Sequence, residues 1–206
     1  MTKLNKAARA ILAGIYVSIG CIGYIRSDSP VIGAFMFSIG LLVICMFHLY
    51  LFTCQVHRVV YSQPNALKRI IRNLVLMWFG NFAGCWFSVL LIRLTRYRGA
   101  MEEICREIVR NKIQDGPSGL FVLGVGCNIL IYTAVHAYKN EDSVIGALAV
   151  VLSVMAFVSC GFEHSIADAF ILIMANAGFM ERIHVLLPVA LGNSVGGIIP
   201  ALVLER

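Results

Sequence analysis

Long apolar stretches separated by short polar ones make up most of this chain. A bilayer has a hydrocarbon layer of about 30 Å, so about 20 apolar residues in a helix are enough for one crossing. Six stretches approach or exceed this length, at residues 8–25, 31–61, 70–95, 118–138, 143–178 and 183–204. The pattern therefore predicts an all-α, polytopic membrane protein with six transmembrane helices in a single domain, residues 1–206.

Composition supports a membrane protein and excludes an ordinary soluble domain. The 206 residues are 59% hydrophobic and 14% charged, with a mean hydropathy of +0.83. A net charge of +6 would suggest nucleic acid in a soluble protein, but here the charges border the apolar stretches, so lipid headgroups explain them and we expect no nucleic-acid partner. The seven cysteines are scattered and form no C-x-x-C pair, so we expect packing roles, with no metal and no cofactor.

Basic residues outside the apolar stretches predict the orientation. Lys3 and Lys6 precede the first stretch, and the connection 57–72 carries basic residues and no acidic one. Both segments are therefore expected on the cytoplasmic side of the inner (plasma) membrane, and six crossings return the carboxyl terminus to that side. The connection 93–117 mixes many basic and acidic residues, which weakens the charge rule there.

Two of the apolar stretches are longer than one crossing requires, and each contains polar residues. The second includes His48, Thr53 and Gln55, and the fifth includes Glu163, His164 and Asp168 just after Gly161; ionisable groups at membrane depth normally face a protein interior or an aqueous path. Irregular backbone is tolerated there only under the same condition. The alternative for the second stretch is a helix that ends near residue 50, with its polar residues among the headgroups.

The two halves of the chain share a motif and an order of elements. Gly80-Asn81-x-x-Gly84 is matched 112 residues later by Gly192-Asn193-x-x-Gly196. Three crossings in each half would make the second half enter the membrane from the opposite side. We therefore expect a three-plus-three inverted repeat, with repeat one about 8–95 and repeat two about 118–204. The breaks at 49–55 and 161–165 are then expected to meet near the midplane and to line one path.

Four motifs in this order resemble the formate/nitrite transporter family, and the resemblance covers nearly the whole chain. They are Leu51-Phe-Thr53, Gly80-Asn-x-x-Gly84, Phe162-Glu-His-Ser-Ile-Ala167 and Gly192-Asn-x-x-Gly196. The resemblance implies an aquaporin-like fold in each subunit and a homopentamer with one pore per subunit. It also implies passage of small monovalent weak-acid anions, with formate or nitrite ahead of hydrosulfide.

The resemblance assigns a substrate pathway to individual residues. His164 corresponds to the central pore histidine, Thr53 to a threonine in the loop that breaks the second helix, Asn128 to an asparagine on the fourth helix, and Lys112 to a vestibule lysine. A bare anion crosses an apolar constriction only at high cost, so we expect a proton partner. Lys112 would attract the anion, and His164 would supply or relay the proton with help from hydrogen bonds of Thr53 and Asn128.

The resemblance also implies two constrictions of the pathway. Phe37 and Leu41 correspond to a cytoplasmic constriction, and Leu51, Ile131 and Phe157 correspond to an outer one.

Four further residues are expected to support the site. Asn81 and Asn193 would tie the broken helices, and Glu163 would form an inter-helix or inter-subunit hydrogen bond. Asp168 lies one helical turn beyond His164, so it could orient that histidine or be a solvated carboxylate at the pore mouth. We expect His48, His57, His136 and His184 to be interfacial, although His48 could also titrate in the pathway.

Several positions depart from the family pattern. His48 and Tyr50 occupy a run where Gly-Ala-Glu or Gly-Ala-Asp is common, and Cys54 and Gln55 follow the threonine. Asp168 replaces a common asparagine after Ser-Ile-Ala. These departures leave the substrate preference and the pH response open.

Three other functions compete with an anion channel. A water or neutral-solute channel would be expected to carry paired Asn-Pro-Ala motifs, and Gln63-Pro-Asn-Ala66 is neither that motif nor paired. A membrane metalloprotein or enzyme could use Glu163, His164 and Asp168, but these three supply only a partial ligand set. A structural protein without transport activity is the third. We expect a transporter that is not an enzyme.

Overall fold

The computed structural model describes residues 3–204, and every regular element in this range is a helix. In chain order these are α1 (Lys3–Arg26), α2 (Pro30–Met46), α3 (Phe52–Gln55), the 3₁₀ helix η1 (Val56–Val59), α4 (Pro64–Arg93), α5 (Arg98–Gln114), α6 (Gly116–Asn140), α7 (Ser143–Ser159), α8 (Ser165–Met174) and α9 (Phe179–Leu204). The prediction of an all-helical fold is confirmed.

Four helices are long and apolar enough to cross a membrane: α1 from Asn5 onward, α4, α6 and α9. Three shorter helices, α2, α7 and α8, are also apolar. Large apolar side chains point outward along the long helices, among them Leu76 and Phe79 on α4 and Leu187 on α9, each more than half exposed. An apolar surface of this extent is typical of a protein that contacts lipid. The chain is therefore a polytopic membrane protein.

The long helices pack in two close pairs, α1 with α4 and α6 with α9. A side chain on Gly84 of α4 would place its Cβ 2.1 Å from the backbone oxygen of Ile11, and one on Gly196 of α9 would place it 2.2 Å from the backbone oxygen of Val125. Only glycine permits these crossings, because any Cβ would collide with backbone. The shorter α2 and α7 pack against each other.

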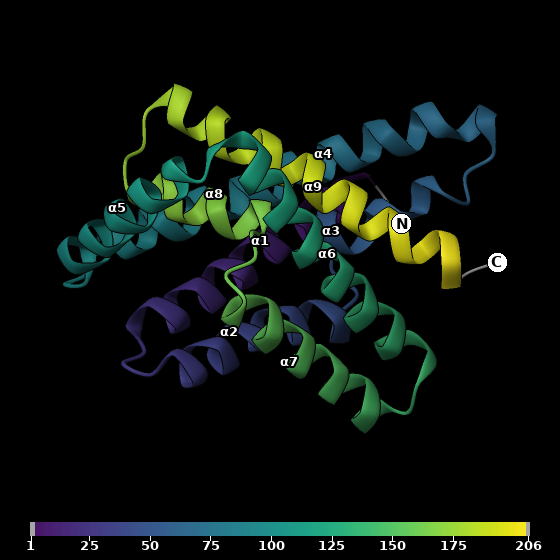
Figure 1. Cartoon of the computed structure of the whole chain (residues 1–206), viewed down its shortest axis with the longest axis horizontal. Coiled ribbons are helices and arrows are strands. Elements are labelled where there is room, and N and C mark those ends of the chain that lie inside the picture. Colours follow the sequence, from purple (N-terminus) through teal and green to yellow (C-terminus); the bar gives the residue numbers. More distant parts are fainter. Residues whose placement is uncertain (1–2, 205–206) are drawn as a thin grey trace.

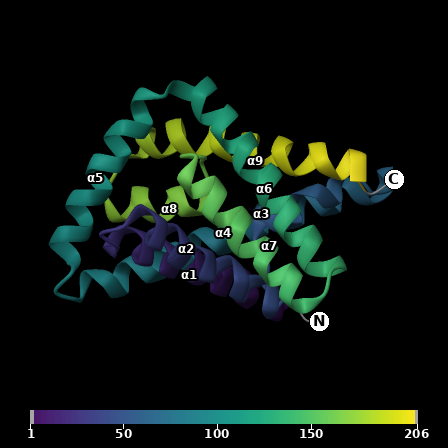
Figure 2. The same cartoon turned by 60° about the horizontal axis from the view of Figure 1, so that its bottom comes forward.

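Both described ends of the chain lie at one end of the molecule (Figures 1 and 2). The turn between α6 and α7 and the start of α4 lie at the same end. The turns between α1 and α2, between α4 and α5, and between α8 and α9 lie at the opposite end. The helix α6 runs between the two ends, and α5 lies close to α8.

The apolar helix α2 stops at Met46, and helical structure resumes at Phe52. His48 has a φ of 50°, and the Leu49 N–H donates to the Ile44 oxygen at 2.9 Å. A left-handed residue followed by this bond is the usual way in which a helix ends, with glycine preferred at the left-handed position. His48 therefore occupies a strained corner, while Thr53 lies in the first turn of α3 and not in the loop that the resemblance implied.

The helix α7 stops in the same manner. Gly161 has a φ of 68°, and the Phe162 N–H donates to the Phe157 oxygen at 3.0 Å. The next helix, α8, begins at Ser165. Here the left-handed corner has the glycine that such a position favours.

The polar connection after α4 contains a helix that the sequence analysis did not assign. Residues 98–114 form α5, and its side chains Met101, Cys105 and Val109 are buried. These positions repeat every four residues and form one apolar face, while the remaining surface is charged. The apolar face is too short and too diluted by charge to cross a bilayer, and it packs on the rest of the protein instead.

Candidate functional site

An asparagine from α4 fastens the first helix break. The Asn81 side chain is fully buried, and its Oδ1 accepts a hydrogen bond from the Phe52 N–H at 3.0 Å. Its Nδ2 donates to the Tyr50 oxygen and to the Ala10 oxygen on α1, both at 2.8 Å. One carboxamide thus satisfies the first free N–H of α3 and a carbonyl of the break, which would otherwise be buried without partners.

An asparagine from α9 fastens the second break in the same way. The Oδ1 of Asn193 accepts from the Ser165 N–H at 2.9 Å. Its Nδ2 donates to the Glu163 oxygen at 2.9 Å and to the Gly124 oxygen on α6 at 2.8 Å. In both breaks the bonded carbonyl lies two residues before the bonded N–H.

His164 is the last residue of the second break and caps α8. Its Nδ1 accepts a hydrogen bond from the Ala167 N–H at 3.2 Å, and its Nε2 lies 3.0 Å from the Thr53 hydroxyl. Because Nδ1 accepts, this network places the proton of the neutral ring on Nε2, which donates to Thr53. The imidazole is buried, with 4% of the residue exposed. This contact joins the two breaks, which are 111 residues apart in the chain.

Asn128 of α6 completes the centre. Its Nδ2 donates to the Thr53 oxygen at 3.2 Å and to the Asn193 oxygen at 2.6 Å. Its Oδ1 and the hydroxyl of Ser165 are buried and have no hydrogen-bond partner among the described residues. Buried polar atoms without a partner are uncommon in proteins. The centre therefore retains polar atoms that could bind a small polar solute or water.

Lys112 of α5 forms a buried ionic cluster with two carboxylates. Its ammonium binds Glu163 and lies 3.0 Å from Oδ1 of Asp168. Burial alone lowers the pKa of Lys112, but the carboxylates of Asp168 and Glu163 outweigh it and raise the pKa above its ordinary value. With both carboxylates ionised, the cluster has one negative charge in excess.

This cluster corrects two expectations. Asp168 is 1% exposed and binds Lys112, so it is not a solvated carboxylate, and among the described residues its carboxylate forms no hydrogen bond with His164. Lys112 is likewise not a free cation, because both carboxylates occupy it. Glu163 accepts a hydrogen bond from Lys112 of α5, which agrees with the expected inter-helix bond. The suggested metal ligands Glu163, His164 and Asp168 do not point to one place, because both carboxylates bind Lys112 and the imidazole contacts Thr53.

The Lys112 cavity, of about 180 Å³, is next to this cluster. His164, Asp168, Phe37 and Phe157 are among its lining residues. The rings of Phe37 and Phe157 meet edge to face with centroids 5.7 Å apart. The assignment of these two residues to opposite constrictions is therefore wrong, because α2 and α7 pack together and bring both rings to one side. Sequence matching cannot detect such a contact between helices.

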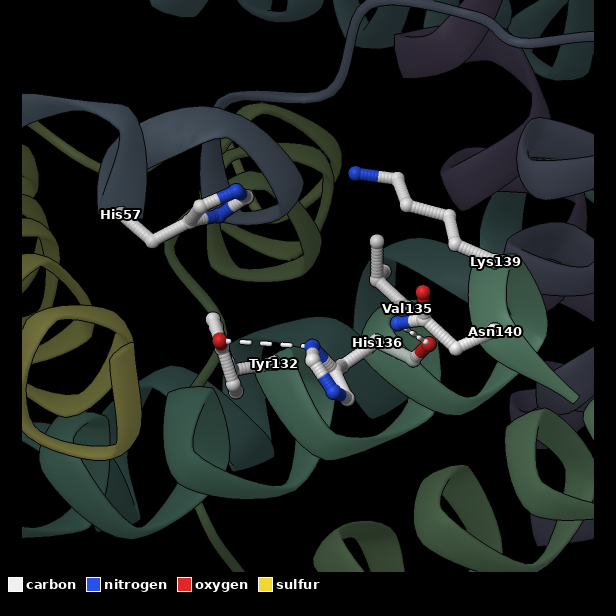
Figure 3. A pocket seen from close by; sticks show the side chains of 6 residues that line it. All are labelled: His57, Tyr132, Val135, His136, Lys139 and Asn140. Carbon is white, nitrogen blue, oxygen red and sulfur yellow. Dashed lines mark hydrogen bonds between the residues drawn. The ribbon is translucent and has the colours of Figure 1, made fainter. Parts of the chain in front are cut away.

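A second cavity, of about 340 Å³, lies at the other end of α6 (Figure 3). We call it the Lys139 cavity; its lining residues are His57, Tyr132, Val135, His136, Lys139 and Asn140. His57 is 8% exposed and packs on the Tyr132 ring, so its side chain faces the protein interior. The i, i+4, i+7 spacing of Tyr132, His136 and Lys139 was the signal available in the sequence.

Comparisons with known proteins agree with this architecture. The chain is 27% identical to formate channel FocA of Escherichia coli strain K12, over 91% of this chain and 80% of that protein. It is 26% identical to formate channel BtFdhC of Bacillus thuringiensis, over 90% and 80%. The chain superposes on a solved pentameric formate channel with formate bound, with a TM-score of 0.84, 27% identity and coverage of 98% and 95% of the two chains.

An FNT family ion channel, at 23% identity, shares the fold with a TM-score of 0.82 over 96% of this chain and 87% of that one. The model of the family described as formate/nitrite transporter matches residues 1–205. The chain belongs to the formate/nitrite transporter family.

Proposed function

We propose that this protein is a membrane channel for small monovalent weak-acid anions, with formate or nitrite as the main substrates and hydrosulfide as a further one. The observation that carries the proposal is the buried contact between His164 and Thr53, 3.0 Å, at the meeting point of the two helix breaks. The relatives named as formate channels and the formate-bound structure support formate as the first substrate to test.

The central groups suit a weak acid and its anion better than a strong-acid anion. The Thr53 oxygen accepts a hydrogen bond from Nε2–H of His164, so the hydrogen of the Thr53 hydroxyl is available to an anion oxygen. The unpartnered Oδ1 of Asn128 can accept a hydrogen bond from the protonated acid. A protonated formic or nitrous acid crosses an apolar ring at far lower cost than its anion. Chloride cannot be neutralised in this way and is excluded.

His164 moves the proton through one ring nitrogen. Nδ1 is engaged by the N–H of Ala167, so exchange with the solute is assigned to Nε2 and the hydroxyl of Thr53. Loss of Nε2–H to the passing anion would leave an imidazolate, so Nε2 takes up a proton from a hydronium ion of the path in the same step, and that ion becomes water. We assign His164 this relay role, with Asn128 holding the Thr53 backbone in place.

Apolar side chains close the path on both sides of the centre. Phe37 and Phe157 narrow the side of the Lys112 cavity, and Leu41 lies one turn after Phe37 on α2. Leu51 and Ile131 are 1% and 2% exposed and are assigned to the side of the Lys139 cavity. Lys112 attracts the anion only when one of its two carboxylates is neutralised by a proton or moves away.

The proposed topology is a three-plus-three inverted repeat within one domain, residues 1–206, with repeats at about 8–95 and 118–204. Support comes from the equivalent bonds of Asn81 and Asn193 and from the equivalent ends of α2 and α7. Described residues near both termini lie at one end of the molecule (Figure 1), in keeping with cytoplasmic termini in the inner membrane. The pentameric neighbour supports a homopentamer.

The test is uptake of formate, nitrite, hydrosulfide and chloride into liposomes that contain the purified protein, between about pH 5 and about pH 8. We expect weak-acid uptake that rises as the pH falls, no chloride uptake, and a loss of at least about tenfold with a flat pH profile in His164→Ala. His184→Ala is the matched control. Equal uptake of chloride, or an unchanged pH profile in His164→Ala, would overturn the proposal.

A further inference from the structure

The Lys139 cavity is lined almost entirely by hydrogen-bond donors. Lys139 supplies an ammonium, His57 and His136 supply imidazoles, Tyr132 supplies a phenol and Asn140 supplies an amide, while Val135 is the one apolar residue among its lining residues. No carboxylate of the described residues lines it. A concave site with one cation and several donors is suited to a small oxyanion.

The donors are held in place by packing of their rings. The Tyr132 ring meets the His57 ring edge to face at 5.3 Å, and stacks on the His136 ring at 5.6 Å (Figure 3). The Tyr132 oxygen lies 3.5 Å from Nδ1 of His136. The Lys139 side chain extends into the same cavity from the last turn of α6. These groups come from two elements, η1 and α6, which face each other across the cavity.

The elements that form the centre also form this cavity. Asn128 and Lys139 lie on one face of α6, since eleven residues complete about three helical turns and rise about 16 Å. His57 follows Thr53 of the centre by four residues. A solute bound beside Lys139 is therefore about 16 Å along α6 from Asn128 of the centre. It lies at the end of α6 opposite to the Lys112 cavity.

The two lysines differ in their surroundings. Lys112 is occupied by Glu163 and Asp168, whereas the ion pairs among the described residues do not include Lys139. The nearby Glu141 and Asp142 in the turn after α6 are not lining residues of the cavity. The positive charge of Lys139 is thus directed at the cavity, while that of Lys112 is offset.

From this geometry we propose that the Lys139 cavity is a second binding site for a small monovalent oxyanion of the carboxylate or nitrite class. The Lys139 ammonium binds the charge, and the remaining oxygen lone pairs are bound by the imidazole of His57 and by whichever of His136 and Tyr132 does not donate in the hydrogen bond that these two share. Binding at this site does not depend on transport. The site would also be the entrance for anions from the end of the molecule where Lys3 and Leu204 lie, and this role rests on the proposed function.

The test measures binding of ¹³C-labelled formate to the purified full chain by line broadening of the formate signal. We expect Lys139→Gln to weaken binding about tenfold, as for loss of a charged hydrogen-bond partner, and Lys139→Arg to retain most of it. Lys68→Gln, an exposed lysine on α4 outside both cavities, should bind as the unmodified protein does. His57→Gln and His136→Gln should each weaken binding by a smaller factor.

His164→Ala separates the two proposals, since it should abolish the pH response of uptake while leaving formate binding at the Lys139 cavity intact. In uptake assays Lys139→Gln should raise the half-saturating formate concentration and keep the maximal rate. Unchanged binding in Lys139→Gln with a normal unfolding midpoint would overturn the inference. It would then leave Lys139 as a basic residue that stabilises the last turn of α6.

Discussion

Replacement of Asn193 by alanine removes three buried hydrogen bonds from one side chain. The Ser165 N–H loses its acceptor, and the Glu163 and Gly124 oxygens lose their donor. All three groups belong to backbone that lies at the break or on α6. The perturbation therefore acts on the position of the whole break, and not on one contact.

The magnitude follows from the three bonds. A hydrogen bond contributes about 1 kcal/mol net, and interhelical bonds in membranes average about 0.6 kcal/mol. A buried donor or acceptor left without a partner costs about 1–3 kcal/mol. We therefore expect Asn193→Ala to lower the free energy of unfolding by about 2–4 kcal/mol, which for a chain of this size lowers the melting midpoint by roughly 10 °C.

The assay is thermal unfolding of the purified protein in detergent, with three variants compared. Asn81→Ala should lower the midpoint by an amount similar to Asn193→Ala, because it removes the equivalent three bonds. Ser194→Ala is the control, since the partner of that hydroxyl among the described residues is the Ala190 oxygen of its own helix. If Asn193→Ala unfolds at the same midpoint as Ser194→Ala, the breaks are held by something other than the asparagines, and the reasoning is refuted.

Two further predictions concern positions where this chain departs from the family pattern. Asp168→Asn removes the excess negative charge beside Lys112, whose raised pKa keeps it cationic across the assay range. Formate uptake near neutral pH should then rise several-fold, because roughly 1 kcal/mol of repulsion between the cluster and the anion is removed. The increase of uptake on acidification should become smaller. Uptake slower than in the control Glu103→Gln would contradict this prediction. His48→Gly should raise the melting midpoint by about 2–8 °C, because a non-glycine residue at a φ of 50° costs about 1–2 kcal/mol. Asn176→Gly, at a φ of 57°, should gain less, since asparagine tolerates this conformation, and an equal gain would count against backbone strain at His48.

The sequence predicted those parts of the site that depend on local pattern. Polar residues within apolar stretches indicated both interruptions, and the repeated Gly-Asn-x-x-Gly motif singled out Asn81 and Asn193. The all-helical membrane fold followed from the lengths of the apolar stretches, because burial in lipid requires them.

The sequence did not predict contacts that depend on how the helices dock. Lys112 and Glu163 are 51 residues apart and meet only because α5 lies against the second break. The contact of Phe37 with Phe157 depends on the packing of α2 on α7. The contact of His57 with Tyr132 was not predicted either, because a histidine just after an apolar stretch has the same local pattern whether it faces headgroups or a ring on another helix.

The glycine crossings described above also restrict how such a channel can open. Gly84 against Ile11 and Gly196 against Val125 leave the helix backbones in direct contact, with no side chains between them to repack. Each contact lies within one half of the molecule, so it prevents α1 from moving against α4 and α6 from moving against α9. Within each rigid half, side chains such as Phe37 and Phe157 are the parts that can rotate to widen or narrow the path.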